Sequence, residues 1–285
     1  MSRTRFAPAP TGYLHLGHVA NALYVWQTAR ELGASVLLRI EDHDRQRCRP
    51  EYEVALLEDL DWLGFCPDLG ATDEFRRGSS AYRQSDSGQF YEEALERLQA
   101  AGHLVYACDC SRKDEAAQAA PDENAGVRYS GHCRERGLAP GPGRGLRVVI
   151  PATVERFEDL RLGPQRQEPA LQCGDLLLRD RLGNWTYQFA VVVDDLRHGI
   201  DLVIRGEDLL DSTGRQLSLA RMLGRPAPPR FLHHPLILKP GGEKLSKGNR
   251  DTSVRDLRAA GMSREQVLRR AAEAVGLQQE TELSD

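Results

Sequence analysis

The chain has 285 residues, of which 40% are hydrophobic and 28% are charged, and its formal net charge is −4. This composition is typical of a globular protein that buries a sizeable core in one large domain or two small ones. The negative net charge argues against a protein that binds a long stretch of nucleic acid, because such a protein needs a strongly basic surface. It favours a small contact area with RNA, or none.

The N-terminal sequence, the lack of a long apolar run and the cysteines bear on the cellular compartment. No apolar run approaches the roughly 20 residues of a membrane span, and no apolar segment follows the basic residues at the N-terminus, as a signal peptide would require. The six cysteines are expected to be reduced in a cytosolic chain. We therefore predict a cytoplasmic protein without a membrane segment.

The first part of the chain alternates predicted strands and helices. In order, these are a strand over 3–6, a helix over 17–33, a strand over 36–40, and helices over 50–64 and 88–101. Pro50 begins the predicted helix over 50–64, and a glycine ends or follows each of the three predicted helices. Proline at a first turn and glycine at the end are typical of helix termini. The alternation predicts an α/β fold with a parallel, doubly wound sheet.

The later segments depart from this alternation. Residues 106–150 are interpreted as an insertion, followed by a hairpin with strands over 174–179 and 185–193. A strand over 202–204, a helix over 212–223 and two short helices broken at 261–263 are predicted next. The expected organisation is a first catalytic half over 1–105, an insertion with a metal clip and the hairpin over 106–185, a second half over 186–250, and a helical tail over 251–285.

Two histidines, His15 and His18, stand at the start of the first predicted helix, with Gly17 between them. At this spacing both imidazoles lie on one side of a helix, and glycine lets another group approach the backbone closely. A helix N-terminus with two hydrogen-bonding rings is suited to binding nucleotide phosphates. The alternative for an isolated pair is two ordinary surface histidines.

Two lysines, Lys244 and Lys247, follow Pro240-Gly241-Gly242, whose composition is typical of a loop. Cations at such a place stabilise the charge that develops during transfer of a phosphoryl group. Taken alone, however, the two lysines are equally typical of a solvated basic turn.

The charged residues Arg5, Arg205 and Glu41 suit a ligand with two carboxylates and one ammonium group. Arginine binds carboxylates in a bidentate manner, and Glu41 would pair with the ammonium group. Tyr187, on a predicted strand, adds a hydroxyl and a flat wall. Each of these residues alone is also consistent with a structural ion pair.

Three cysteines, Cys108, Cys110 and Cys133, predict a tetrahedral zinc clip, in which thiolates hold a structural ion. A fourth ligand is needed, for which His132 or His103 is the usual chemical choice. The alternative is that the thiols are simply buried. The remaining three cysteines lack such neighbours and are assigned to packing.

Paired acidic residues are candidates for holding magnesium near a nucleotide. They are Asp194-Asp195 and Glu207-Asp208, although such pairs more often cap loops or face solvent. His233 and His234, which precede the lysine segment, are candidates for contacting an adenine.

Five motifs, taken together, resemble the catalytic domain of class I aminoacyl-tRNA synthetases. They are Arg5-Phe6-Ala7-Pro8-Ala9-Pro10-Thr11-Gly12, His15-Leu16-Gly17-His18, Arg39-Ile40-Glu41-Asp42, Ile204-Arg205-Gly206-Glu207-Asp208 and Lys244-Leu245-Ser246-Lys247-Gly248. The third and fourth motifs narrow the resemblance to the glutamyl branch. The short stretch after Gly248 leaves no room for an anticodon-binding domain, so the chain resembles the short paralogues called glutamyl-Q tRNA(Asp) synthetases.

This resemblance implies a Rossmann-like class I catalytic domain with a zinc-bearing insertion and a short helical C-terminal segment. It also implies a ligase that forms glutamyl-adenylate from L-glutamate and ATP without tRNA. The glutamyl group would then be transferred to the cyclopentene-diol of queuosine in the anticodon of tRNA(Asp).

The resemblance also implies roles for individual residues. Catalysis is assigned to His15, His18, Lys244 and Lys247, and ATP binding to His15, Gly17, His18 and Lys247. Glutamate binding is assigned to Arg5, Phe6, Ala7, Pro8, Ala9, Glu41, Tyr187 and Arg205. Metal binding is assigned to Cys108, Cys110, Tyr129 and Cys133, since Tyr129 lies four residues before Cys133 as in the short paralogues.

The implied cofactors are ATP, the Mg²⁺ that accompanies it, and structural Zn²⁺. The implied partners are glutamate, ATP and the queuosine-containing anticodon stem-loop of tRNA(Asp), with no membrane partner, and a monomer is expected. Three alternatives remain: a minimal glutamyl-tRNA synthetase that charges tRNA(Glu), an enzyme that adenylates glutamate for another acceptor, and a non-enzymatic regulatory paralogue.

Two local departures from related sequences are present. Gly248 stands where the family commonly has serine, and a change in the mobility of the lysine segment is expected from it. The segment Gln84-Ser85-Asp86-Ser87 has serine where related sequences often carry a basic residue after Gln-Ser.

Overall fold

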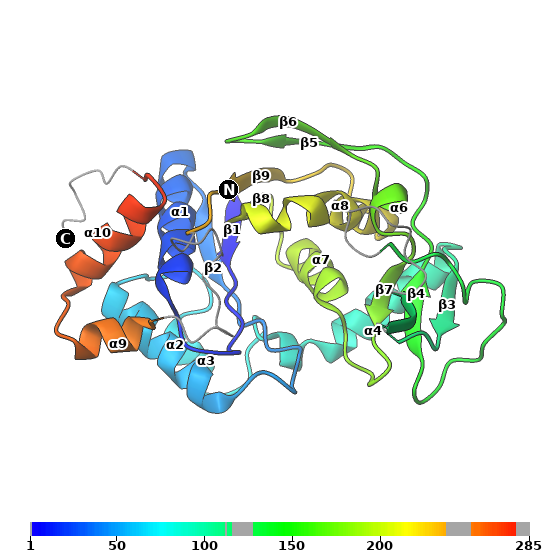
Figure 1. The fold of residues 1–285 in the computed structure, drawn as a ribbon, viewed down its shortest axis with the longest axis horizontal. Coiled ribbons are helices and arrows are strands. Elements are labelled where there is room, and N and C mark those ends of the chain that lie inside the picture. Colours follow the sequence, from blue (N-terminus) through cyan, green and yellow to red (C-terminus); the bar gives the residue numbers. More distant parts are fainter. Residues whose placement is uncertain (1, 112, 116–127, 238–251, 278–285) are drawn as a thin grey trace. The chain divides into compact units, whose positions relative to one another are not determined.

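The computed structural model describes residues 2–111, 113–115, 128–237 and 252–277, which form two compact units (Figure 1). Unit 1 comprises Met1–Asp86, Asp201–Asp208 and Phe231–Asp285, and unit 2 comprises Ser87–Ile200 and Leu209–Arg230. Each unit has its own buried hydrophobic core. The segment boundaries predicted at 105, 185 and 250 stay predictions.

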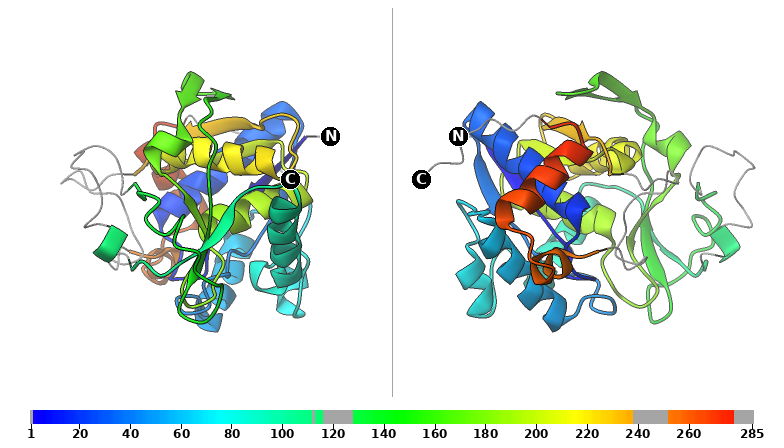
Figure 2. Two further views of the ribbon diagram at one scale, coloured as in Figure 1. Left: turned by 90° about the vertical axis from the view of Figure 1, so that its right-hand side faces the viewer. Right: turned by 60° about the vertical axis from the view of Figure 1, so that its left-hand side comes forward.

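Unit 1 combines strands from the first part of the chain with strands from its later part. Its elements are β1 (Arg3–Phe6), α1 (Leu16–Leu32), β2 (Ser35–Leu38), α2 (Pro50–Leu63), α3 (Thr72–Arg76), β8 (Leu202–Gly206), most of β9 (Arg230–His234), α9 (Val254–Ala259) and α10 (Arg264–Ala274). Figure 2 shows α10, in red, beside α1, in blue, as their packing contact requires.

Parallel pairing joins β1 to β2, from Arg3 opposite Ser35 to Phe6 opposite Leu38. Hydrogen bonding continues beyond the strands, since the Glu41 N–H donates to the Pro8 carbonyl at 3.1 Å. On the other side of β1, β8 packs against it, and β8 is also hydrogen-bonded to β9. The parallel α/β architecture predicted from the alternation of elements is thereby confirmed.

Helix ends in unit 1 follow the local sequence signals. Gly33, after α1, has φ 60°, and Gly64, after α2, has φ 75°. This left-handed conformation is accessible to glycine without a Cβ penalty and ends a helix by bonding its last carbonyls. The first residue of α2 is Pro50, where the missing N–H costs no helical hydrogen bond.

Unit 2 is built around an antiparallel sheet and three longer helices. Its elements are α4 (Gly88–Ala100), β3 (Val105–Cys108), β4 (Gly145–Val148), β5 (Glu155–Asp159), β6 (Gly163–Gln167), α6 (Pro169–Gln172), β7 (Leu176–Arg179), α7 (Tyr187–Arg197) and α8 (Thr213–Met222). β4 lies between β3 and β7 and is antiparallel to both, and β5 and β6 form an antiparallel hairpin.

One predicted strand is wrong: residues 187–193 belong to the helix α7, not to a hairpin strand. Its run of aromatic and β-branched residues favours a strand by propensity. All residues from Phe189 to Asp195 are buried, and α7 packs against α4, α8 and β7. In a fully buried apolar run, periodicity does not tell a helix from a strand. Tertiary packing makes this segment a helix.

The other predicted helices are confirmed, including α8 and the two short helices of the tail, α9 and α10, which are separated at 260–263. Among the residues that the structure describes, no helix is both long enough and apolar enough to cross a membrane.

Candidate active site and metal centre

The start of α1 is capped by two histidine side chains. The Gly17 N–H donates to His15 Nδ1 at 3.1 Å, and the His15 N–H donates to His18 Nδ1 at 3.1 Å. The two rings lie 3.9 Å apart. Because both Nδ1 atoms accept, these hydrogen bonds assign each neutral ring its proton on Nε2. Each imidazole is therefore a hydrogen-bond donor through Nε2, the polarity that binding of phosphate oxygens requires.

Gly17 is required by this cap and not by its backbone conformation. A Cβ atom at this position would lie 3.0 Å from His15 Cε1 and 3.1 Å from His15 Nδ1. A side chain at position 17 would therefore require the His15 ring to shift by a few tenths of an ångström.

Three charged residues of the predicted glutamate pocket lie at neighbouring strands of unit 1. Arg5 is on β1, Arg205 is on β8, and Glu41 follows β2; all three are buried. Arg5 Nη1 donates to the carbonyl of Ile204 at 3.2 Å. In parallel sheets, ligands bind beyond the carboxyl ends of the strands, which is where the end of β2 presents Glu41.

Two partners that hold this pocket were not anticipated. Arg39 Nη2 donates to Glu41 Oε1 at 3.1 Å, and Arg205 Nε donates to His233 Nε2 at 3.1 Å. The pairing of Arg39 with Glu41 could have been predicted from the sequence, because residues i and i+2 of an extended chain point to the same side. The second has none, since it joins distant segments. His233 was considered as an adenine contact; its buried ring is engaged with Arg205.

The other predicted site residues are placed as follows. The Phe6 side chain lies in the core of unit 1 with its ring 5.6 Å from that of Trp26. Ala7, Pro8 and Ala9 follow β1, and Tyr187 is the first residue of α7 in unit 2. Lys244, Lys247 and Gly248 lie outside the described residues.

Asp194 is not suited to holding magnesium. Its Oδ2 accepts a hydrogen bond from the Tyr91 hydroxyl at 2.9 Å, and its Oδ1 accepts one from Arg197 at 3.0 Å. The side chain is fully buried. Its carboxylate therefore stabilises the packing of α7 in unit 2.

A buried cluster in unit 2 has the geometry of a metal centre. The Sγ atoms of Cys108, Cys110 and Cys133 all lie within 4.8 Å of one another, with Cys110 and Cys133 at 3.6 Å. The Tyr129 hydroxyl lies 3.4 Å from the Cys108 sulfur and 3.8 Å from the Cys110 sulfur. Thiolates bound tetrahedrally to zinc lie about 3.8 Å apart, so the three sulfurs fit a zinc ion and Tyr129 is placed beside them.

Two arginines lie against this cluster. Arg147 Nε donates to Cys108 Sγ at 3.4 Å, and its guanidinium carbon lies 3.7 Å from the centroid of the Tyr129 ring. Arg136 Nη1 donates to Cys133 Sγ at 3.3 Å. Burial raises the pKa of the Cys110 thiol to about 12. A bound cation and the two guanidinium groups would offset the charge of the deprotonated ligands.

We expect Cys110→Ser to abolish stoichiometric zinc binding and to lower Tm, because hydroxyl is a poor zinc ligand and the ion crosslinks β3 to residues 129–133. Cys173→Ser is the matched control, since Cys110 and Cys173 are each 8% exposed but only Cys110 belongs to the cluster. Metal analysis of the purified proteins should give about one zinc per chain for the control. Equal zinc contents in the two variants would contradict the assignment.

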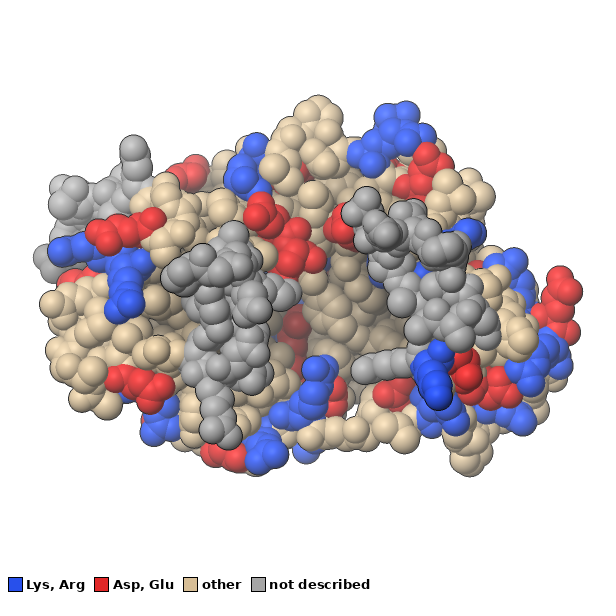
Figure 3. Space-filling model, viewed as in Figure 1, with Lys and Arg blue, Asp and Glu red and all other residues tan. Residues whose placement is uncertain are grey.

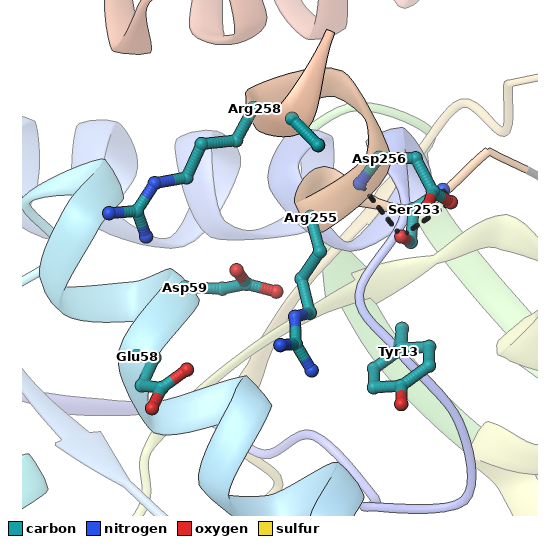
Figure 4. A pocket seen from close by; sticks show the side chains of 8 residues that line it. Tyr13, Glu58, Asp59, Ser253, Arg255, Asp256 and Arg258 are labelled. Atoms are coloured by element: carbon teal, nitrogen blue, oxygen red, sulfur yellow. Dashed lines mark hydrogen bonds between the residues drawn. The ribbon is translucent and has the colours of Figure 1, made fainter.

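A pocket of about 660 Å³ lies beside the start of α9. Asp59, on α2, lies between the side chains of Arg255 and Arg258 (Figure 4). This carboxyl is 1% exposed, and its Oδ2 has no hydrogen-bond partner among the described residues. Burial raises the pKa of Asp59 to about 7, and the two arginines offset only part of this effect.

Asp59 should make stability fall as pH rises. Its pKa is higher in the folded chain, so between the ordinary value of 3.8 and about 7 the folded state keeps a proton that the unfolded state has lost. We expect Asp59→Asn to remove this slope and to be more stable than the parent near about pH 8, by at most about 4 kcal/mol. The two proteins should converge near about pH 4.

Denaturant unfolding at several pH values measures this difference. Glu96→Gln is the control, because Glu96 is an exposed acidic residue that does not line this pocket. If the unfolding free energies of Asp59→Asn and the parent stay parallel across the range, Asp59 does not carry the effect.

A family model and curated relatives match nearly the whole chain and name the same class of synthetase. The family described as "tRNA synthetases class I (E and Q), catalytic domain" matches residues 1–283. Among curated proteins, a glutamyl-Q tRNA(Asp) synthetase of Symbiobacterium thermophilum is 42% identical over 96% of this chain and 86% of its own length. One of Rhodobacter capsulatus is 41% identical over 91% of this chain and 96% of its own length.

Solved structures share the fold. A glutamate-tRNA synthetase of Elizabethkingia anophelis superimposes with a TM-score of 0.71 at 31% identity, covering 92% of this chain and 54% of that one. A glutamate tRNA ligase of Elizabethkingia meningosepticum, in complex with its amino acid, gives a TM-score of 0.70 at 31% identity, with 92% and 53% covered. The chain thus spans about half the length of these two proteins.

Proposed function

Because this chain belongs to the family of class I tRNA synthetase catalytic domains for glutamate and glutamine, we propose that it activates L-glutamate with ATP and transfers the glutamyl group to queuosine of tRNA(Asp). The relatives named glutamyl-Q tRNA(Asp) synthetase support the choice of acceptor. The observation that carries the activation step is the placement of Arg5, Glu41 and Arg205 at neighbouring strands of the unit whose first helix is capped by two histidines.

In the first step a carboxylate oxygen of glutamate attacks the α-phosphorus of ATP, and pyrophosphate leaves. Arg5 and Arg205 bind the two carboxylates of glutamate, and Glu41 pairs with its ammonium group. His15 and His18 donate hydrogen bonds from Nε2 to phosphate oxygens. Such a step needs little covalent help from the protein, and positioning with charge stabilisation supplies most of the rate enhancement.

Lys244 and Lys247 supply further positive charge to the phosphates in this proposal, and Mg²⁺ enters with ATP as part of the substrate. The backbone of Ala9 lines the glutamate pocket of unit 1 in this proposal, and Tyr187 is a further residue assigned to glutamate by the resemblance. In the second step a hydroxyl of the queuosine cyclopentene-diol attacks the carbonyl carbon of glutamyl-adenylate, an ester forms, and AMP leaves.

The RNA contact in this proposal is small and covers the anticodon stem-loop alone. The formal net charge is −4, and on the face drawn in Figure 3 the visible basic and acidic side chains are interspersed. A limited number of phosphate contacts suits such a surface. We propose that the chain acts as a monomer in the cytoplasm.

The test has two stages. Glutamate-dependent exchange of pyrophosphate into ATP, measured without tRNA, should be present. Labelled glutamate should then be transferred to queuosine-containing tRNA(Asp) but not to queuosine-free tRNA(Asp) or to tRNA(Glu). Transfer to tRNA(Glu) would instead indicate a minimal charging enzyme, and absence of exchange from a folded, zinc-loaded protein would indicate a regulatory paralogue.

A further inference from the structure

The register of the sheet in unit 2 brings an arginine of β4 to the face that carries the first cysteine of the cluster. In the antiparallel pair, Tyr106 lies opposite Arg147, and Cys108 lies two residues farther along β3. Residues that lie opposite each other on two strands, and residues two apart on one strand, share one side of a sheet. The backbones of β3 and β4 therefore hold Arg147 and Cys108 on the same face.

Arg147 is buried, and all three nitrogens of its guanidinium group have partners. Only 4% of its side chain is exposed. Nε donates to Cys108 Sγ at 3.4 Å, Nη1 donates to the Asp175 carbonyl at 2.9 Å, and Nη2 is ion-paired with Glu115. The guanidinium carbon lies 3.7 Å from the centroid of the Tyr129 ring. One side chain thus connects a cysteine of the cluster, the tyrosine beside it and the residue before β7.

Tyr129 is held by two main-chain contacts and by this one side chain. Its N–H donates to the Cys173 carbonyl at 3.1 Å, and its hydroxyl accepts a hydrogen bond from the Cys133 N–H at 3.0 Å. The Arg147 guanidinium covers the face of its ring. Of these three contacts, only the one with Arg147 is removed by replacing a side chain, so a substitution at 147 is the direct way to release the ring.

A second arginine contacts the cluster from the exposed side. Arg136 Nη1 donates to Cys133 Sγ at 3.3 Å and to Asp109 Oδ1 at 2.6 Å, and its Nη2 donates to Asp109 Oδ2 at 3.1 Å. The Arg136 side chain is 40% exposed. Water can replace the N–H of an exposed arginine, whereas a hydrogen bond in the interior has no such substitute. The two arginines therefore make similar N–H···S hydrogen bonds in different surroundings.

We propose that Arg147 is the positioning residue of the metal centre, which fixes Cys108 Sγ and the Tyr129 ring relative to each other and so sets the affinity for zinc. The inference rests on the assignment of zinc to the three cysteines. It goes beyond the proposed function, because its test measures the metal and not the reaction. Removing a group that orients metal ligands typically lowers affinity by about 10–100-fold. Arg147 is such a group because it reaches two members of the cluster at once and is shielded from water.

Three variants separate the contacts of the two arginines. Arg147→Met removes the N–H donors and the charge but keeps an unbranched side chain that fills a buried place. Arg147→Lys keeps the positive charge but loses the planar fork, so it cannot engage the sulfur and the ring together. Arg136→Met is the matched control, because it removes an N–H···S hydrogen bond of nearly the same length.

The dissociation constant for zinc is measured by competition between each zinc-loaded protein and a chelator of known affinity. We expect it to rise by about 10–100-fold in Arg147→Met and by about tenfold in Arg147→Lys. It should stay within about threefold of the parent in Arg136→Met. Equal shifts in Arg147→Met and Arg136→Met, or parent affinity in Arg147→Lys, would overturn the inference. A parent that binds no zinc would overturn the assignment of the metal as well.

The visible spectrum of the cobalt-loaded proteins distinguishes positioning from a general loss of stability. The absorption bands of Co²⁺ bound in place of zinc depend on the geometry of its ligands. We expect these bands to change in Arg147→Met and Arg147→Lys and to match the parent in Arg136→Met. Arg147→Lys keeps the test decisive should Arg147→Met not fold, and a parent-like spectrum in Arg147→Lys would overturn the inference.

Arg134→Met controls for disturbance of Asp175. Arg134 donates from Nε to Asp175 Oδ2 at 3.0 Å and from Nη2 to Asp175 Oδ1 at 2.7 Å, and within the described part of the chain it makes no hydrogen bond to a sulfur of the cluster. Its replacement should lower Tm without changing the zinc dissociation constant or the cobalt spectrum. If Arg134→Met changes both as much as Arg147→Lys does, the effect is one of stability, and Arg147 has no positioning role.

Discussion

Gly17→Ala should lower glutamate-dependent pyrophosphate exchange by about tenfold without a matching loss of stability. A methyl group at this position would lie 3.0 Å from the His15 ring, so the ring would have to shift by a few tenths of an ångström from the position in which it caps α1. Alanine is favoured over glycine in a helix by about 1 kcal/mol, which offsets the loss of the His15 cap. The variant is therefore expected to fold normally and to be a poor catalyst.

The experiment compares kcat/KM for ATP with Tm for each protein. Gly88→Ala is the control, since Gly88 opens α4 and a Cβ atom there would meet no atom within 4 Å. It should keep full exchange activity. Activity in Gly17→Ala within a factor of about three of the parent, with His15 displaced, would remove the histidine cap from the mechanism.

Arg205→Lys should raise the KM for glutamate by about 100-fold and leave the KM for ATP nearly unchanged. Lysine keeps one positive charge but lacks the planar fork that binds a carboxylate through two parallel hydrogen bonds. Hydrogen bonds to charged groups contribute about 1.5–3 kcal/mol each, which is the size of the expected change. The His233 contact to Nε would also be lost, so a modest fall in Tm is expected.

Arg225→Lys separates the loss of stability from the loss of recognition. Arg225 donates from Nε to the Ala227 carbonyl at 3.0 Å and from Nη2 to the Ile200 carbonyl at 2.6 Å. Its replacement should lower Tm to a similar degree without changing either KM. If both variants shift the KM for glutamate alike, Arg205 does not contact the substrate.

Local signals in the sequence were sufficient for most elements of this fold. The glycines after α1 and α2 and the proline that opens α2 act on neighbouring backbone groups, so their effects can be predicted without the rest of the chain. The same is true of Gly17, although only the coordinates show that its Cβ would strike His15.

The prediction was wrong for α7, whose central side chains are all buried. α7 was expected as a strand because its aromatic and β-branched residues favour one. It is a helix because packing against α4, α8 and β7 buries all of its sides. Its central run, Phe189–Val193, is entirely apolar, and such a run fits a buried strand as well as a buried helix.

The family, the chemical types at the site and the three cysteines of the cluster could be predicted from the sequence, because they depend on which residues occur and in what order. The partner that each buried polar group takes depends on the packing of unit 1: Arg39 for Glu41, His233 for Arg205, and the Val254 N–H for the Leu14 carbonyl. The last two contacts join segments separated by many residues. Their geometry follows from how the strands and helices of unit 1 pack, and packing is a property of the whole core and not of any one motif.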